Sequence, residues 1–238
     1  MTLSRRTFFV ASATGAAAGA AALPAQAASP ANAALGIDAY DLGLRPNLQA
    51  DQTQSLQRAI DRAAQARLPL LLAPGVYRSG ELRLPANAKI AGTRGATRIE
   101  LQGAPSSLLT AQRSDNIELT GLVLDGRKIR PEQNRGLVHF RDATSMRIAD
   151  CTILNAGRNG MTLERCAGEV TGCTVEDAGD GAIFAIDSTG LRIAGNVVRR
   201  AGNNGIQVWR SAPGDDGTMI TDNRVEEIRA DAGGDGPY

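Results

Sequence analysis

The chain has 238 residues, of which 42% are apolar, and its 26 basic and 25 acidic side chains give a formal net charge of +1. This balance gives no electrostatic reason to expect binding to nucleic acid or to an anionic membrane surface. With one histidine and three cysteines, the sequence has no metal-ligand spacing of His and Cys, and a Ser-His-Asp triad is not favoured.

Residues 1–27 have the pattern of an export signal peptide. Paired arginines precede an Ala/Gly-rich apolar stretch at 10–23, and an A-x-A cleavage site follows. The arginine pair favours a twin-arginine signal over an ordinary secretory signal, so we expect the twin-arginine translocase as a partner and a periplasmic or secreted location. No later stretch is long and apolar enough to span a membrane. The signal residues are Arg5, Arg6, Ala25 and Ala27.

After an N-terminal segment at 28–50, residues 51–68 are predicted to form a helix. Leu56, Ile60 and Ala63 lie at helical spacing, and Asp51 or Thr53 can cap the first turn. A stack of β-coils needs its end covered, because exposed strand edges pair with other chains. We therefore expect this helix to cap the structure that follows.

Residues 69–238 read as short strands that repeat every 22 to 29 residues or so, about the length of one β-helix coil. The triplet Ile148, Cys151 and Ile153 recurs 22 residues later as Val170, Cys173 and Val175 and then as Ile193, Asn196 and Val198. Gly, Asn and Asp fall between the strands, where corners need positive φ. This pattern predicts an all-β parallel β-helix and disfavours an α-solenoid or a leucine-rich repeat.

The cysteines and the C-terminus carry two further expectations. Cys151 and Cys173 should stack in adjacent coils, and we favour buried thiols over a disulfide between them. The motif Gly234-Asp235-Gly236 should lead into another strand, yet two residues later the sequence stops at Tyr238. We expect either further coils beyond Tyr238 or a partner chain that covers the last coil.

A family resemblance rests on residues near the helix. Asp41-Leu42-Gly43, then 50–60, then Ala73-Pro74-Gly75-Val76-Tyr77 resemble the N-terminal region of the pectin-lyase-like superfamily. With its leader and its Asn/Asp-Gly coils, the whole chain resembles the twin-arginine-translocated uncharacterised repeat family. The resemblance implies a right-handed, single-stranded parallel β-helix and export; it implies no particular reaction.

Enzymes of that superfamily bind a long sugar chain in a groove along one coil face, so candidate catalytic residues follow from the resemblance. Acid hydrolysis needs two carboxylates, and Asp180 and Asp235 stand on turns about two coils, roughly 9.6 Å, apart. The Gly-His-Gly motif of polygalacturonases is absent, and these residues are also suited simply to turns. Lys128 and Arg135, in the long loop 125–136, can act as an elimination base or bind a sugar carboxylate; a solvated loop is the alternative. His139 is a further candidate, although a lone strand histidine is more often structural.

Candidate ligand-binding residues lie on the same turns and on the following strand. An exposed Trp209 can stack on a sugar ring if Ile206 and Val208 face inward. Ca²⁺ is the cofactor we consider, with Asp215, Asp216 and Asp180 as ligands, although turn roles are favoured. The predicted substrate-binding residues are Asn159, Asn204, Gln207, Trp209 and Arg210.

The sequence thus predicts an exported protein that acts on or binds an acidic polysaccharide. A lyase or glycoside hydrolase of uronic-acid polymers is the first expectation. A non-catalytic carbohydrate-binding or cell-envelope scaffold protein is the alternative.

Overall fold

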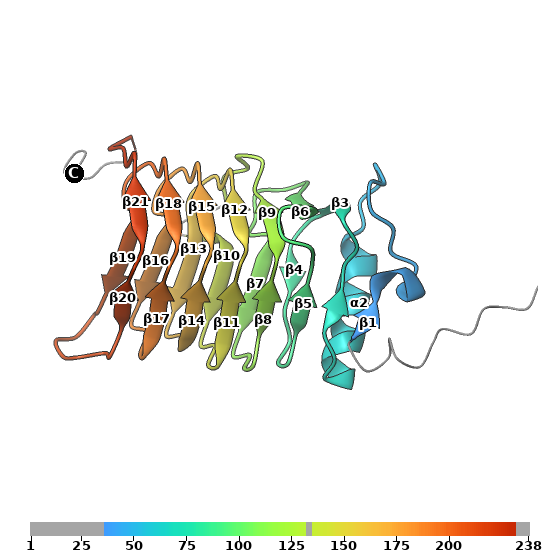
Figure 1. The fold of residues 1–238 in the computed structure, drawn as a ribbon, viewed down its shortest axis with the longest axis horizontal. Coiled ribbons are helices and arrows are strands. Elements are labelled where there is room, and N and C mark those ends of the chain that lie inside the picture. Colours follow the sequence, from blue (N-terminus) through green and yellow to red (C-terminus); the bar gives the residue numbers. More distant parts are fainter. Residues whose placement is uncertain (1–35, 132–134, 232–238) are drawn as a thin grey trace, which may run out of the picture.

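The computed structural model describes residues 36–131 and 135–231. Figure 1 shows an elongated stack of coils, each of which passes through the same three strand positions before it starts the next. The predicted signal peptide and Asp235 lie outside the described residues.

Three parallel sheets run the length of the stack, and we call them sheets A, B and C. Sheet A contains β1 (Ile37–Asp38), β2 (Leu70–Leu71), β5 (Lys89–Ala91), β8 (Glu118–Thr120), β11 (Met146–Ala149), β14 (Gly168–Thr171), β17 (Leu191–Ala194) and β20 (Met219–Thr221). Sheet B contains β3 (Gly75–Ser79), β6 (Thr97–Leu101), β9 (Leu122–Asp125), β12 (Thr152–Leu154), β15 (Thr174–Glu176), β18 (Val197–Arg199) and β21 (Arg224–Glu226). Sheet C contains β4 (Leu82–Arg83), β7 (Leu109–Gln112), β10 (Gly136–Arg141), β13 (Asn159–Glu164), β16 (Ile183–Ile186) and β19 (Ile206–Trp209).

The predicted repeat sets the register of these sheets. Ile148 pairs with Val170 and Val170 with Ile193 in sheet A, while Ile153 pairs with Val175 in sheet B. These side chains are fully buried, so equivalent positions of successive coils stack into apolar ladders that no single coil can bury alone. The parallel β-helix prediction is confirmed.

The middle residue of the triplet forms a ladder at the corner between sheets A and B. Cys151 and Cys173 are buried there as free thiols, as predicted. Their neighbour Asn196 is 1% exposed; its side-chain oxygen accepts the Cys173 N–H at 2.9 Å and its amide donates to the Val170 carbonyl at 3.0 Å. The polar member of the ladder is therefore satisfied by backbone groups of the adjacent coil.

Left-handed residues make the corners; Asn155 and Asp177 fit the predicted Asn/Asp pattern, whereas Arg200 is a residue type that the pattern did not predict. Asn155, Asp177 and Arg200 have φ of 52°, 57° and 53°, and they follow three consecutive strands of sheet B. Arg200 is also ion-paired with Asp177 at 2.9 Å. Each corner is stabilised by its neighbours and turns the chain from sheet B toward sheet C.

The helix α2 (Thr53–Ala66) covers the N-terminal end of the stack, as Figure 1 shows, and confirms the expected cap. Leu56, Ile60 and Ala63 are buried against the first coil. The helix starts at Thr53 and its N-cap is Gln52, which makes no side-chain cap bond, so the expectation of Asp51 or Thr53 at the cap is wrong. The Asp51 carboxylate accepts the Thr53 N–H at 2.8 Å from one residue before the cap. A 3-10 helix, η1 (Ala39–Leu42), precedes it. Within the described residues, the structure contains no helix with the length and apolar character of a membrane span.

Candidate functional site

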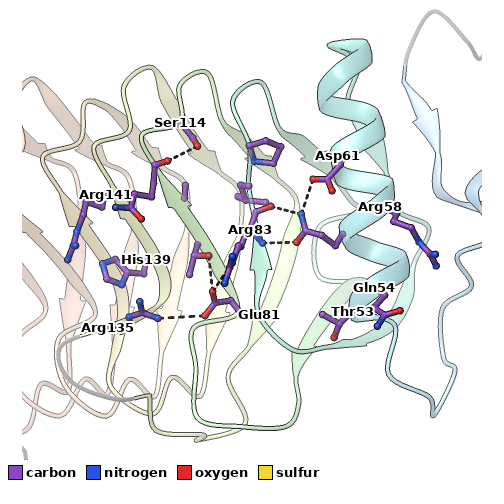
Figure 2. Close-up of a pocket in the computed structure, with 16 residues that line it drawn as sticks. Thr53, Gln54, Arg58, Asp61, Glu81, Arg83, Ser114, Arg135, His139 and Arg141 are labelled. Atoms are coloured by element: carbon purple, nitrogen blue, oxygen red, sulfur yellow. Dashed lines mark hydrogen bonds and ion pairs between the residues drawn. The ribbon is translucent and has the colours of Figure 1, made fainter.

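A groove of about 1130 Å³ lies between α2 and the outer face of sheet C. Its walls are formed by one side of α2, by β4, β7 and β10, and by the residues that flank these strands, as Figure 2 shows. The lining residues are Thr53, Gln54, Gln57, Arg58, Asp61, Glu81, Arg83, Leu84, Pro85, Thr110, Ala111, Gln112, Ser114, Arg135, His139 and Arg141. The groove is therefore a feature of the first three coils, next to the cap.

Strand alternation decides which side chains face the groove. Val138 and Phe140 are fully buried in the core, so His139, between them, points to the outer face. Its partner in register on β7 is Thr110, which pairs in turn with Arg83 on β4. Alternation in the sequence could not decide whether His139 points inward or outward; the buried positions of Val138 and Phe140 show that it points outward.

His139 belongs to a hydrogen-bonded network with Glu164 and Arg141. Its Nε2 lies 3.1 Å from Glu164 Oε1, and Arg141 Nε donates to Glu164 Oε2 at 2.6 Å. Burial opposes ionisation of Glu164, but the bonds from Arg141 and His139 outweigh it and hold the pKa of this carboxyl below its usual value. Glu164 is therefore an anion that orients the imidazole.

Burial also lowers the pKa of His139, an effect that the neighbouring Glu164 only partly opposes. The ring is consequently neutral near pH 7. A neutral imidazole that donates from Nε2 to an ionised carboxylate carries its lone pair on Nδ1. Such a nitrogen can accept a proton, which is the property of a general base.

A second network surrounds Glu81, one strand away from His139 in the groove. Its carboxylate lies 3.6 Å from Arg83 Nε and 3.6 Å from an Arg135 nitrogen, and Thr110 donates its hydroxyl at 3.3 Å. Figure 2 shows Arg83 and Arg135 on either side of this carboxylate, whereas Arg58 extends away from sheet C. The two networks meet at Thr110, which is the register neighbour of His139.

Gln57 attaches α2 to the edge of sheet C. Its amide donates to the Arg83 carbonyl at 2.7 Å and its side-chain oxygen accepts the Arg83 N–H at 2.8 Å. The same amide lies 3.0 Å from Asp61. Since both backbone groups of Arg83 are bonded, the wall of the groove is fixed at this point and only the arginine side chain is free to move.

The charge of the lining is biased toward cations. Four arginines line the groove, at 58, 83, 135 and 141, against two carboxylates, Asp61 and Glu81. Arginine binds planar carboxylates in a forked geometry and stays charged at any relevant pH. The groove can therefore bind a polyanion, although the chain as a whole is nearly neutral.

Of the predicted catalytic residues, the structure brings Arg135 and His139 together in the groove. Lys128 comes from the same loop but its amine donates to the backbone carbonyl of Asp177, two coils away. It is absent from the groove lining. Of the two candidate cations in this loop, only Arg135 therefore lies in the groove.

The turn residues form two ladders rather than one. Met161 pairs with Ile183, and Ile183 pairs with Ile206. Counting back three residues from each, Asp180 lies in register with Arg158 and Asn203. Its carboxylate accepts a hydrogen bond from the Asn203 amide at 3.1 Å. The sequence pattern suggests that Asn159, Asp180 and Asn204 share one turn ladder, and the register shows that this alignment is wrong by one residue.

The two predicted asparagines make the bonds of turn residues. Asn159 is buried; it accepts the Gly181 N–H at 2.9 Å and donates to Thr162 at 3.1 Å. Asn204 donates to Gln207 three residues on, at 3.3 Å. Neither lines the groove.

Trp209 lies farther along the outer face of sheet C. Ile206 and Val208 pack against the core, which meets the condition for an exposed tryptophan, and Trp209 is 55% exposed. The register runs from Arg141 through Glu164 and Ile186 to Trp209, so that three strand spacings, roughly 14 Å, separate Trp209 from the groove. The exposed Arg210 follows and bonds the Ala212 carbonyl at 3.1 Å.

The Ca²⁺ ligands considered from the sequence do not come together. Asp215 and Asp216 lie between β19 and β20, where each accepts a backbone N–H two residues later at 2.8 Å. Asp180 lies between β15 and β16, at a different corner. Among the described residues, no group of three or more His, Cys, Asp and Glu side chains is arranged to hold a metal ion.

The coils, their three parallel sheets and their apolar ladders define a right-handed parallel β-helix. The chain belongs to the family described as the right-handed beta helix region, whose model matches residues 90–228, more than half of the sequence. No curated protein matches the chain in sequence.

Solved structures are similar in fold at low sequence identity. A candidate glycosyl hydrolase from Parabacteroides merdae has a TM-score of 0.66 at 16% identity, over 79% of this chain and 96% of its own. The N-terminal fragment of gene product 12 of bacteriophage Phi29 has a TM-score of 0.64 at 16% identity, over 82% and 38%. ORF18 of Geobacillus virus E2 has a TM-score of 0.62 at 12% identity, over 84% and 43%. This chain spans less than half of the length of each phage protein.

Proposed function

We propose that the groove binds an acidic polysaccharide and that the protein is a lyase of uronic-acid polymers. The observation that carries the proposal is the position of His139, a neutral imidazole in a groove that also holds Arg83, Arg135 and Arg141. A uronate polymer offers one carboxylate per sugar, which arginines bind, and an acidic C5 proton, which a base removes. The fold similarity to a candidate glycosyl hydrolase agrees with a carbohydrate ligand.

The chemistry proposed is β-elimination. His139 Nδ1 takes the C5 proton, the electron pair forms the C4–C5 double bond, and the C4–O4 bond breaks. The leaving oxygen takes its proton from water. An arginine on the sugar carboxylate stabilises the negative charge that develops as the C5 proton leaves.

Hydrolysis is less well supported by the same groove. It needs one carboxyl group that is protonated at working pH and a second that is ionised. Glu164 is held ionised by Arg141, and Asp61 and Glu81 are bonded to Gln57 and to Arg83. A base and several arginines fit elimination, which needs no acidic carboxyl.

We further propose that the protein acts after export, in the periplasm or outside the cell. The twin-arginine pattern of the first 27 residues supports this location. A fusion of residues 1–27 to a reporter that is active only outside the cytoplasm tests it. Activity that persists when Arg5 and Arg6 are replaced by lysine would argue against this route.

The test of function is an assay of the purified protein on polygalacturonate and alginate, read by the ultraviolet absorbance of the new double bond. We expect product from the wild type and a loss of at least about 100-fold, the usual contribution of a general base, for His139→Asn. A polymer that binds without yielding product would instead support the alternative, a non-catalytic binding protein. That alternative draws support from the burial of His139, which is 8% exposed.

A further inference from the structure

The carboxylate of Glu81 lies among cationic and hydroxyl groups of the groove. Two arginines and one hydroxyl surround it, with Arg83 and Arg135 at 3.6 Å and Thr110 at 3.3 Å. All of these residues line the groove. Two guanidinium groups and a hydroxyl are groups that can bind a planar carboxylate.

The contacts of Glu81 are loose in comparison with those of Glu164, the carboxylate that holds His139. Glu164 receives a bond of 2.6 Å from Arg141, whereas both arginines stand a full ångström farther from Glu81. The side chains are also accessible: Arg83 is 85% exposed and Arg135 47%. Exposed ion pairs of this kind contribute only about 0–1 kcal/mol, so a ligand can replace this one at little cost.

The neighbours of Glu81 are held in place by other residues. The backbone of Arg83 is held by Gln57 through bonds of 2.7 and 2.8 Å. Thr110 is fixed in register beside His139 on the next strand, about 4.8 Å away. The site is thus one strand from the proposed base, a distance on the scale of one sugar residue.

We infer that Glu81 occupies the subsite for a carboxylate of the ligand and is displaced when the ligand binds, an inference that rests on the proposed function. Arg83, Arg135 and Thr110 are then the residues that bind this carboxylate. Glu81 shields the two arginines from each other and repels an acidic polymer until its side chain moves. It acts as an internal competitor.

The test compares Glu81→Gln with the wild type in affinity electrophoresis through gels that contain polygalacturonate or alginate. Removing a competing charge should tighten binding by up to about fivefold, which corresponds to a surface charge pair of about 1 kcal/mol. In an Arg135→Gln background the gain should shrink, because one of the released arginines is missing. Glu81→Ala, which tests the same loss of charge without an amide, should also bind more tightly.

Glu118→Gln is the matched control. Glu118 lies on sheet A, where it pairs with Lys89 at 3.7 Å and Arg147 at 3.2 Å, so the substitution removes the same charge away from the groove. We expect it to leave the affinity unchanged. Equal tightening by both substitutions would reduce the effect to net charge and overturn the inference.

The outcomes separate this inference from the proposed function. If the wild type binds neither polymer and yields no product, the proposed function fails. If the wild type binds but Glu81→Gln binds equally or more weakly, the proposed function stands and the displacement of Glu81 is refuted.

Discussion

Glu164 Oε1 lies 3.1 Å from Nε2 of His139 across two paired strands of sheet C. The relationship joins residues 25 apart in the sequence, and it fixes which nitrogen of the ring carries the proton. The second carboxylate oxygen is held by Arg141 at 2.6 Å. The orientation of the imidazole therefore depends on a residue that does not itself line the groove.

The first prediction concerns the charge of His139. Burial lowers its pKa and Glu164 partly opposes this effect, so Glu164→Gln should lower the pKa of His139 further by removing an attraction for the protonated ring. Since the chain has a single histidine, one Cε1–H signal in a proton NMR titration reports this value directly. We expect a wild-type midpoint below about 6.5, the unperturbed value, and a lower one in the variant. A midpoint above that value in the wild type would contradict the proposed role as a neutral base.

The same shift predicts how stability depends on pH. A histidine with a lower pKa in the folded than in the unfolded chain costs stability as the pH falls, because the unfolded chain takes up the proton first. The loss should begin near pH 6.5 or so, the unfolded value, and end at the folded pKa. Urea unfolding of the wild type and of His139→Asn at several pH values from about 7.5 to about 5.5 measures this loss of stability. Parallel pH profiles for the two proteins would contradict the prediction.

The sequence repeat predicted the coils because each coil needs apolar residues at the same positions as its two neighbours. Ile148, Val170 and Ile193 must all be apolar to stack inside the sheet, and a repeated pattern records that requirement. Asn196 was placed in the same ladder from its spacing alone, and the structure supplies its reason, since its amide bonds the backbone of the neighbouring coil.

The groove was only partly predictable, because its residues come from strands that share no motif. Arg83, Thr110 and His139 are brought into register by three successive coils, and the loop lengths between them differ. Arg141 and Glu164 were missed for the same reason. Alternation alone places His139 and Arg141 on one face, but the sequence did not reveal which face was outside until Val138 and Phe140 were found buried.

The next prediction concerns the cap. Leu56 is 1% exposed between α2 and the first coil, so Leu56→Ala should lower the free energy of unfolding by about 2–5 kcal/mol, the usual range for a core leucine. Arg62→Ala, on the exposed side of the same helix, is the control and should change it by less than about 0.5 kcal/mol. Thermal unfolding followed by circular dichroism compares the two. A small effect of Leu56→Ala would mean that the coil stack does not depend on its cap.

The last prediction concerns the length of the ligand. Trp209 is exposed on the same outer face as the groove, three strands from Arg141. We take for its stacking on a sugar the range of about 0.5–1.5 kcal/mol that a pair of aromatic rings contributes. Trp209→Ala should therefore weaken retention of a long polyuronate by about twofold to tenfold, and it should not affect a short oligomer confined to the groove. Since Trp209 is the only tryptophan, its fluorescence also reports whether a ligand reaches it.

Tyr40→Ala is the control for an exposed aromatic ring, since Tyr40 is 42% exposed in η1 at the N-terminal end and is absent from the groove lining. Retention of the polymer should be unchanged by this substitution. If Trp209→Ala also leaves long and short ligands equally retained, the binding surface ends within the first coils. A loss of retention for long polymers alone would instead mean that the binding surface extends along sheet C, in the direction in which successive coils are stacked.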